Sequence, residues 1–280
     1  FEGLQNVRDY MQKYPYSCLE QEVSKSISLR DPKGWSNISG KISAYLDSDG
    51  LAKYFPSSYW GSEVLTSYVL TIAHDAGWEL PESSRNRMLG ALARFVEGTL
   101  YRRGELPTAD LVIRKLGAIE ALSRYGKAKT EYISTIPIEP NLWPVSALID
   151  WWNILYRMKN IQERDVRLKE VEDIIRSRMN LQGTVISFSS DKSDYLWWLM
   201  VSPDVNSARL LSTIVEQKKW NEDIPRIVQG VLSRQKKGIW DTTTANAFGI
   251  LSMEKFSKEF ERISVSGKTT VAVEEIQKTV

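Results

Sequence analysis

Six times along the chain, a small or polar start leads into an unusually apolar helical segment, and this repeat constrains the fold more than any other feature. The segments cover residues 17–29, 61–73, 107–122, 143–155, 202–215 and 241–253. Their starts lie on average about 45 residues apart, a period typical of one helical hairpin repeated along a chain. Such hairpins bury their apolar helices against neighbouring repeats. The repeat therefore predicts an all-α fold.

Helices with one apolar and one charged face lie between these segments. The clearest covers 162–179, where Leu168, Val171 and Ile175 recur at helical spacing. The others are expected at 4–13, 36–46, 83–100, 127–134 and 222–234. Alternating inner and outer helices predict a closed (α/α)6 toroid, because closure leaves no apolar end face exposed. We expect the N-terminal helix to close the ring against the last inner helix. An open helical solenoid is the alternative.

The pattern changes after residue 262. Apolar and polar residues then alternate around Gly267, which predicts one or two strands. The alternating positions are Ile263, Val265, Thr269, Val271 and Val273. We therefore assign 1–262 to the toroid and 263–280 to a short β segment that leads to an adjacent β domain. The chain starts at Phe1 without a Met and ends within the strand pattern, so we interpret both ends as cuts in a longer protein.

Composition excludes several classes of function. Lys and Arg number 37 against 35 Asp and Glu, a net charge of +2, and this near balance gives no basic face for nucleic acid. No apolar run approaches the roughly 18 residues of a membrane span. Cys18 and His74 are the single cysteine and histidine, which excludes a disulfide framework and a zinc site of about three or four Cys and His ligands. We expect neither a cofactor nor a metal.

The cysteine lies in a motif with specific chemistry. In order, its residues are Tyr14, Pro15, Tyr16, Ser17, Cys18, Leu19, Glu20 and Gln21. Pro15 fixes φ and keeps Tyr14 extended, so a helix is expected to begin just after it, with Ser17 as N-cap. Cys18 and Gln21 then share one face of the first turn, and the helix dipole is expected to lower the pKa of the Cys18 thiol. The sulfur can reach the side-chain carbonyl carbon of Gln21, and loss of ammonia would leave an internal thioester.

The segment Cys18–Gln21, preceded by Pro15 and Tyr16, resembles the thioester motif of alpha-2-macroglobulins and complement C3-like proteins. It is most similar to the bacterial branch, which often has Leu where vertebrate members have Gly. Segments 138–144 and 242–247 also resemble that branch. The resemblance covers essentially the whole chain, and it implies an (α/α)6 toroid with the thioester at the start of an inner helix. Ser17 departs from the pattern, since many members have Gly there.

The resemblance implies a parent protein that inhibits endopeptidases as a covalent trap. A protease cleaves a bait region elsewhere in the parent, and one of its lysine amines then attacks the uncovered thioester at Gln21. The event happens once, so the protein is not an enzyme. A neighbouring β domain of the parent would shield the thioester from water, and Tyr14 and Tyr16 are placed to help. The resemblance also implies a periplasmic or extracellular location, in a lipid-anchored parent or a free one, and a role like that of innate-immune defence.

Some complement-like relatives use a histidine to form an acyl-imidazole that favours hydroxyl targets. His74 is the single candidate, and it falls near the C-terminal end of the second inner segment. With parallel inner helices, that position is at the opposite rim from Cys18. A histidine there is also explained by contacts with the helix C-terminus. We therefore predict that amines are preferred over hydroxyls.

Two other functions remain as alternatives. The first is a carbohydrate-active (α/α)6 enzyme, which needs two carboxylates across a cleft and would use acids and tryptophans at the inner-helix starts. These residues are Glu63, Asp110, Asp204, Asp241, Trp60, Trp143 and Trp240. Helix capping explains the acids equally well, and core packing explains the tryptophans, including the pairs 151–152 and 197–198. The second alternative is a non-covalent interaction scaffold without a working thioester.

Overall fold

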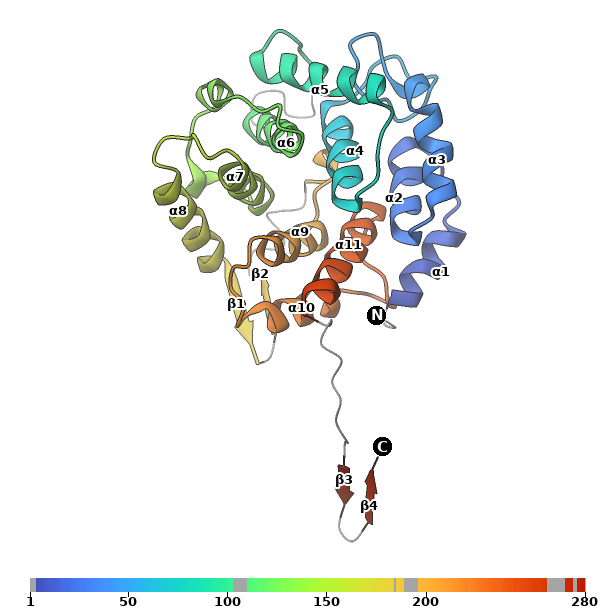
Figure 1. Cartoon of the computed structure of the whole chain (residues 1–280), viewed down its shortest axis with the longest axis vertical. Coiled ribbons are helices and arrows are strands. Elements are labelled where there is room, and N and C mark those ends of the chain that lie inside the picture. Colours follow the sequence, from blue (N-terminus) through green and yellow to red (C-terminus); the bar gives the residue numbers. More distant parts are fainter. Residues whose placement is uncertain are drawn as a thin grey trace.

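A computed structural model describes residues 4–102, 110–183, 185–188, 196–260, 270–273 and 276–279. Six largely buried helices form an inner layer, and each follows one of the predicted segment starts. They are α2 (Leu19–Leu29), α4 (Glu63–Ala76), α6 (Leu111–Arg124), α7 (Val145–Arg157), α9 (Pro203–Glu216) and α11 (Thr243–Phe260). Figure 1 shows them arranged around a common centre, which confirms the all-α toroid.

In the described part of the chain, five α-helices and the 3-10 helix η3 (Thr130–Thr135) form the outer layer. The helices are α1 (Gln5–Lys13), α3 (Pro32–Lys41), α5 (Glu82–Glu97), α8 (Arg164–Ser177) and α10 (Ile224–Ser233). The 3-10 helix η2 (Ile42–Tyr45) follows α3 directly. The helix predicted at 127–134 is instead the 3-10 helix η3. Only Tyr132 and Ile133 of η3 are buried, so this segment has too short an apolar stripe to hold a longer helix against the core.

The ring closes where α2 packs against α11, which lie side by side in Figure 1. The hydroxyl of Thr243 at the start of α11 donates a hydrogen bond to Oε1 of Glu20 on α2, at 2.7 Å. Helix α1 packs on the outside of α2. The closing role that we predicted for the N-terminal helix therefore belongs to the first inner helix.

Neighbouring inner helices run parallel, which places their starts on one face of the ring, here called the N-terminal face. At the start of α4, Glu63 accepts a hydrogen bond from Arg114 in the first turn of α6, at 2.6 Å. At the start of α11, the backbone N–H of Asp241 donates to Asp204 in the first turn of α9. At the opposite rim, the guanidinium of Arg30, which follows α2, donates to the last carbonyl of α4.

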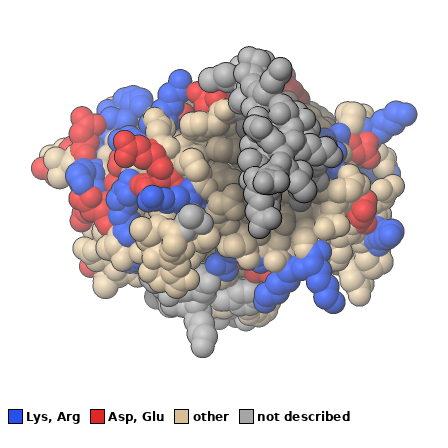
Figure 2. Space-filling model, turned by 90° about the horizontal axis from the view of Figure 1, so that it is seen from below, with Lys and Arg blue, Asp and Glu red and all other residues tan. Residues whose placement is uncertain are grey.

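The buried interior contains large aromatic side chains and paired charges. Trp151 and Trp152 of α7 are fully buried. Glu120 of α6 pairs with Arg124 of the same helix at 2.7 Å and with Arg157 of α7 at 2.9 Å. Paired charges of this kind are costly to break, since removal of one partner leaves an uncompensated buried charge worth about 3–5 kcal/mol. On the face of the molecule in Figure 2, basic and acidic side chains are interspersed, as the near-zero net charge leads us to expect.

Two short β-hairpins accompany the helices. Strands β1 (Met179–Gln182) and β2 (Val185–Phe188) pair antiparallel, with Met179 opposite Phe188. This hairpin was not predicted, because its strands are only four residues each. Strands β3 (Thr270–Val273) and β4 (Ile276–Thr279) also pair antiparallel, which confirms strands within 263–280; Ile263, Val265, Gly267 and Thr269 lie outside the described residues. Among the described residues, no helix is long and apolar enough to cross a membrane.

The hairpin β1–β2 reaches the ring at a glycine of α10. A Cβ at Gly230 would lie 2.0 Å from the carbonyl oxygen of Ile186 in β2, and backbone at that distance cannot move aside locally. We therefore expect Gly230→Ala to lower the free energy of unfolding by about 1–3 kcal/mol, as overpacking does. Urea unfolding followed by circular dichroism measures this.

Gly40→Ala is the matched control, because Gly40 is exposed on α3 and a Cβ there meets nothing within 4 Å. It should be neutral or slightly stabilising, since Ala is the better helix former by about 1 kcal/mol. Equal stability of the two variants would show that β2 does not pack against Gly230 in solution.

Candidate thioester site on the N-terminal face

Cys18 is the residue at which the first inner helix begins. Its backbone is extended (φ −72°, ψ 165°), and α2 starts at the next residue, Leu19. Cys18 is therefore the N-cap itself, and the prediction of Ser17 in that role is wrong by one position. Ser17 and Pro15 are exposed in the connection from α1, whereas Cys18 and Leu19 are buried. The side chain at residue 18 thus points into the protein where a capping side chain is required.

Cys18 and Gln21 form a reciprocal capping box. The backbone N–H of Cys18 donates to Oε1 of Gln21 at 3.1 Å, and the Cys18 side chain faces the backbone N–H of Gln21 in return. A capping box normally satisfies two unpaired N–H groups of a helix start. Here it also folds the side-chain amide of Gln21 back toward the residue that carries the sulfur. The helix start therefore holds the side-chain amide of Gln21 against the backbone of Cys18.

The pKa of the Cys18 thiol is raised, not lowered as we predicted. Burial is the largest cause, since it disfavours the thiolate, and the negative charge of Glu20 adds to it. Hydrogen bonds from the backbone N–H groups of Gln21 and Glu20 act in the opposite direction. The helix start does favour the thiolate, but desolvation outweighs it.

Glu20 connects the site to the closing helix of the ring. Its Oε1 accepts hydrogen bonds from Ser24 at 2.6 Å and from Thr243 of α11 at 2.7 Å. The Ser24 hydroxyl lies 2.6 Å from that of Tyr68 in α4. Burial raises the pKa of Glu20 despite both hydroxyl contacts. Sequence reasoning missed Ser24, Tyr68 and Thr243, because no linear signal relates these positions.

Tyrosines surround the start of α2. Tyr14 is half-buried and makes edge-on ring contacts with Tyr10 and Tyr16, each at 5.6 Å between centroids. The ring of Tyr16 is 66% exposed. On the other side, the carbonyl of Tyr54 accepts the backbone N–H of Leu19, and burial raises the pKa of the Tyr54 phenol to about 12. Tyr54 was also missed by sequence reasoning.

The N-terminal face is hollowed beside this site. Tyr14, Glu20 and Tyr54 line a cavity of 330 Å³ whose far wall is the segment 241–244. Tyr54 also borders a wider groove of 930 Å³, which Trp60, Trp197 and other aromatic residues line. Both hollows lie on the same face as the Cys18–Gln21 pair, so they give an approaching molecule access to that side of the ring.

The acids of the carbohydrate alternative are held in internal contacts. Arg114 donates to Glu63 at 2.6 Å and to Asp110 at 3.3 Å, and all three side chains are buried. Asp204 pairs with Arg234 and accepts the backbone N–H of Asp241. These contacts fit the structural interpretation, in which acids cap and bridge the helix starts.

The tryptophans divide into two groups. Trp143 and Trp240 are buried, as are Trp151 and Trp152, so these four belong to the core. Trp60 is exposed beneath the guanidinium of Arg102. Trp197 is 63% exposed in the 3-10 helix η5 (Trp197–Leu199). The prediction that the 197–198 pair is helical core is therefore wrong: Trp197 is exposed, Trp198 is half-buried, and both line the groove.

His74 lies far along α4 from Cys18 and Gln21. It is in the last turn of that helix, two residues before Ala76, whose carbonyl accepts from Arg30 at the far end of α2. Cys18 begins α2, so His74 and Cys18 sit at opposite rims, as predicted. The His74 ring packs edge-on against Tyr125 at 5.5 Å, and its Nδ1 lies 3.9 Å from Asp75.

A ring of parallel inner helices inside an outer layer defines an all-α toroid with a thiol–amide pair at one inner-helix start. Comparison with solved structures identifies this fold in bacterial alpha-2-macroglobulins. The native Escherichia coli protein, from domain MG7 to its C-terminus, matches with a TM-score of 0.71 and 18% identity over 99% of this chain and 45% of that one. The E. coli protein in its native conformation matches with a TM-score of 0.70 and 17% identity over 99% of this chain and 18% of that one.

A third match is Salmonella alpha-2-macroglobulin reacted with methylamine, with a TM-score of 0.66 and 17% identity over 99% of this chain and 19% of that one. This chain thus spans less than half of the length of the structures that it matches. No family model and no curated protein sequence matches it. The likeness is one of fold, and it extends over nearly the whole chain.

The raised pKa of Cys18 can be measured in Gln21→Ala, which retains a free thiol because it cannot form a thioester. We expect the rate of alkylation by iodoacetamide to rise with pH around a midpoint above the ordinary value of about 8.5, because burial disfavours the thiolate. In urea the midpoint should return to about 8.5. A native midpoint below that value would mean that the helix dipole dominates after all.

Proposed function

We propose that this chain is the thioester domain of a bacterial alpha-2-macroglobulin-like endopeptidase inhibitor. The observation that carries the proposal is the Cys18–Gln21 capping box at the first inner helix of a toroid found in bacterial alpha-2-macroglobulins. Neither the motif nor the fold would suffice alone, since the same fold hosts unrelated functions. Their combination at a single helix start supports acyl storage at Gln21.

Formation of the bond needs only the two side chains. The Cys18 sulfur adds to the side-chain carbonyl carbon of Gln21, the thiol proton passes to the amide nitrogen, and ammonia leaves. The hydrogen bond from the Cys18 N–H to Oε1 polarises this carbonyl. The same N–H is placed to stabilise the negative charge that develops on that oxygen in acyl transfer, as an oxyanion-hole donor does.

Reaction with a target transfers the acyl group of Gln21 from the Cys18 sulfur to an amine. A primary amine adds to the Gln21 carbonyl, the carbon–sulfur bond breaks, and the products are an amide and the Cys18 thiol. The thioester is consumed, so the event is one covalent capture and not turnover. His74 lies at the opposite rim, which leaves direct attack by lysine amines as the expected route and target proteases as the partners. The E. coli relatives include structures activated by trypsin and by porcine elastase.

The parent protein would supply the remaining parts of the trap. We assign the bait region and the shielding β domain to parts of the parent outside this chain, because the chain matches less than half of the alpha-2-macroglobulin structures. A periplasmic or extracellular location, with or without a lipid anchor, follows from the same proposal. There a thioester would also explain a single cysteine, since its sulfur is already bonded.

The bond itself can be tested by intact mass spectrometry of freshly purified native protein. We expect a mass below the sequence value by one ammonia, which rises by one methylamine on treatment while one thiol appears. Cys18→Ala and Gln21→Ala are the controls, and both should show the sequence mass with no change on treatment. A mass that matches Glu at residue 21 would mean that the bond formed and was hydrolysed.

An unmodified mass, with Cys18 reactive from the start and Gln21 still an amide, would contradict the proposal if the full-length parent gave the same result. The non-covalent scaffold would then be the better description. Cleavage of oligosaccharides would instead favour the carbohydrate-active enzyme.

Shielding of the proposed thioester from water by Tyr14 gives a second test. Tyr14 is half-buried beside Glu20, whereas the Tyr16 ring is mostly exposed. We expect Tyr14→Ala to speed reaction of the thioester with methylamine by roughly tenfold, because it opens a path for water and amine to a desolvated bond. Tyr16→Ala should change the rate by much less. Thiol release measured with a chromogenic disulfide follows both variants, and equal rates would assign the shielding to other residues.

A further inference from the structure

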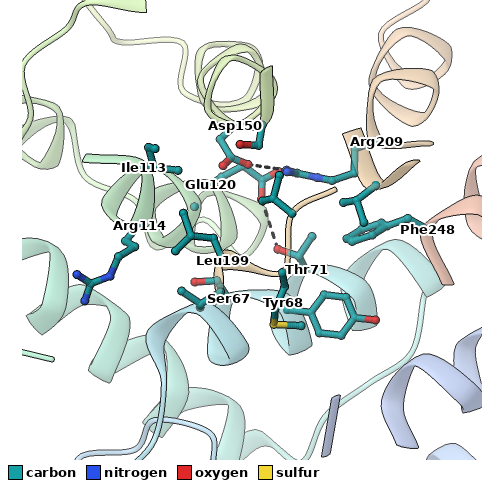
Figure 3. Close-up of a pocket in the computed structure, with 16 residues that line it drawn as sticks. Ser67, Tyr68, Thr71, Ile113, Arg114, Glu120, Asp150, Leu199, Arg209 and Phe248 are labelled. Atoms are coloured by element: carbon teal, nitrogen blue, oxygen red, sulfur yellow. Dashed lines mark hydrogen bonds and ion pairs between the residues drawn. The ribbon is translucent and has the colours of Figure 1, made fainter. Parts of the chain in front are cut away.

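The centre of the ring contains a small cavity that the thioester chemistry does not use. Its volume is 90 Å³, and side chains of five inner helices and of the segment 199–201 enclose it (Figure 3). Its walls are mainly apolar, as in small-molecule sites with a few placed polar groups. The apolar residues are Val64, Ile113, Leu199, Met200, Val201, Val205 and Phe248.

Two serine hydroxyls in this cavity lack partners. Ser67 of α4 and Ser146 of α7 both line it, and they are only 8% and 1% exposed. Neither Oγ has a hydrogen-bond partner among the described residues. A buried hydroxyl without a partner is costly. Two of them beside one cavity indicate that something polar can occupy it.

Asp150 of α7 supplies a negative charge to the same cavity. Its Oδ1 accepts from Arg209 of α9, whereas its Oδ2 lies toward Gly117, where a Cβ would be only 3.7 Å away. Burial raises the pKa of Asp150 to about 6, and the neighbouring charge of Glu120 adds to this. Oδ2 of Asp150 therefore lies at the cavity wall, and a bound cation there would stabilise the ionised form that burial disfavours.

An anion suits the cavity less well. The guanidinium of Arg209 is engaged with Asp150, and that of Arg114 points away from the cavity and binds Glu63 and Asp110. The hydroxyls can accept hydrogen bonds, and a primary ammonium has three donors and no acceptor. The charge of Asp150 therefore favours a cation, and the serine hydroxyls can accept its hydrogen bonds.

We propose that this cavity binds a primary alkylammonium group, either a free small amine or the end of a lysine side chain. The ammonium donates to Oδ2 of Asp150 and to the hydroxyl of Ser146, which lies one turn earlier on the same face of α7, and the methylene groups extend along the apolar walls. The cavity shares Val64, Arg114 and Leu199 with the wide groove of the N-terminal face, so the ligand enters from that face. The site needs no thioester.

The test uses the whole chain with Cys18→Ala, which removes any reaction of an amine with a thioester. We expect saturable binding of n-butylamine in isothermal titration calorimetry. 1-Butanol has the same chain length without the charge, and it should bind at least about tenfold more weakly, because a charge-assisted hydrogen bond is lost. No saturable amine binding, or equal binding of the alcohol, would overturn the proposal.

Gly117→Ala in the same background places a methyl group beside Oδ2 of Asp150. It should fold, because the contact at 3.7 Å is ordinary and Ala favours a helix, and it should weaken amine binding at least about tenfold by filling the site. Gly90→Ala is the matched control on the exposed face of α5, where a Cβ meets nothing within 4 Å. Unchanged binding in Gly117→Ala would place the amine elsewhere.

Ser146→Ala separates a ligand site from a merely imperfect core. It should raise the melting temperature of the unliganded protein, since it removes an unpaired buried hydroxyl, and yet weaken amine binding. Stronger or unchanged binding would contradict the assigned contact. A short acetylated peptide with one lysine distinguishes the sources: binding comparable to n-butylamine indicates a lysine side chain, and binding of n-butylamine alone indicates a free amine. All these results are independent of whether the wild-type chain forms a thioester.

Discussion

The parallel arrangement of the inner helices is the constraint on which the rest of the structure depends. It gathers the unpaired N–H groups of the helix starts on one face, and each such start needs acceptors. Ser62 caps α4 and Ser202 caps α9, each through a hydroxyl that accepts the backbone N–H three residues on. Cys18 occupies the equivalent position on α2. The proposed thioester is thus a covalent form of a helix cap, at a position that serine hydroxyls cap on α4 and α9.

The inner helices and their starts were the parts of the structure that the sequence could predict. The repeat of apolar segments was sufficient to predict the six inner helices, because the apolar run of each inner helix is long. The pairing of Cys18 with Gln21 was also predictable, since it depends on local helix geometry. Segment 127–134 was mispredicted as a helix because the short apolar patch of Tyr132 and Ile133 looks alike in a helix and in a 3-10 turn.

Contacts between distant segments could not be predicted. Thr243 reaches Glu20 across more than two hundred residues, and Tyr54 covers α2 from a loop that carries no recognisable motif. The direction of the pKa shift of Cys18 was mispredicted because it also depends on distant contacts. The helix dipole can be inferred from the motif alone, whereas desolvation depends on neighbours that the fold brings in. The exposure of Trp197 likewise follows from its position at the rim of a groove.

Burial of Cys18 has a further consequence for the proposed chemistry. In acyl transfer from Gln21 the Cys18 thiolate is the leaving group, and a thiol with a higher pKa leaves more slowly. The desolvation that raises the pKa of Cys18 would therefore slow the loss of the proposed thioester while the site is covered. Exposure of the helix start would remove that desolvation and leave the dipole and the backbone N–H groups to favour the thiolate. In the proposed thioester, the opposing effects on Cys18 would thus make one bond slow to react when buried and fast to react when exposed.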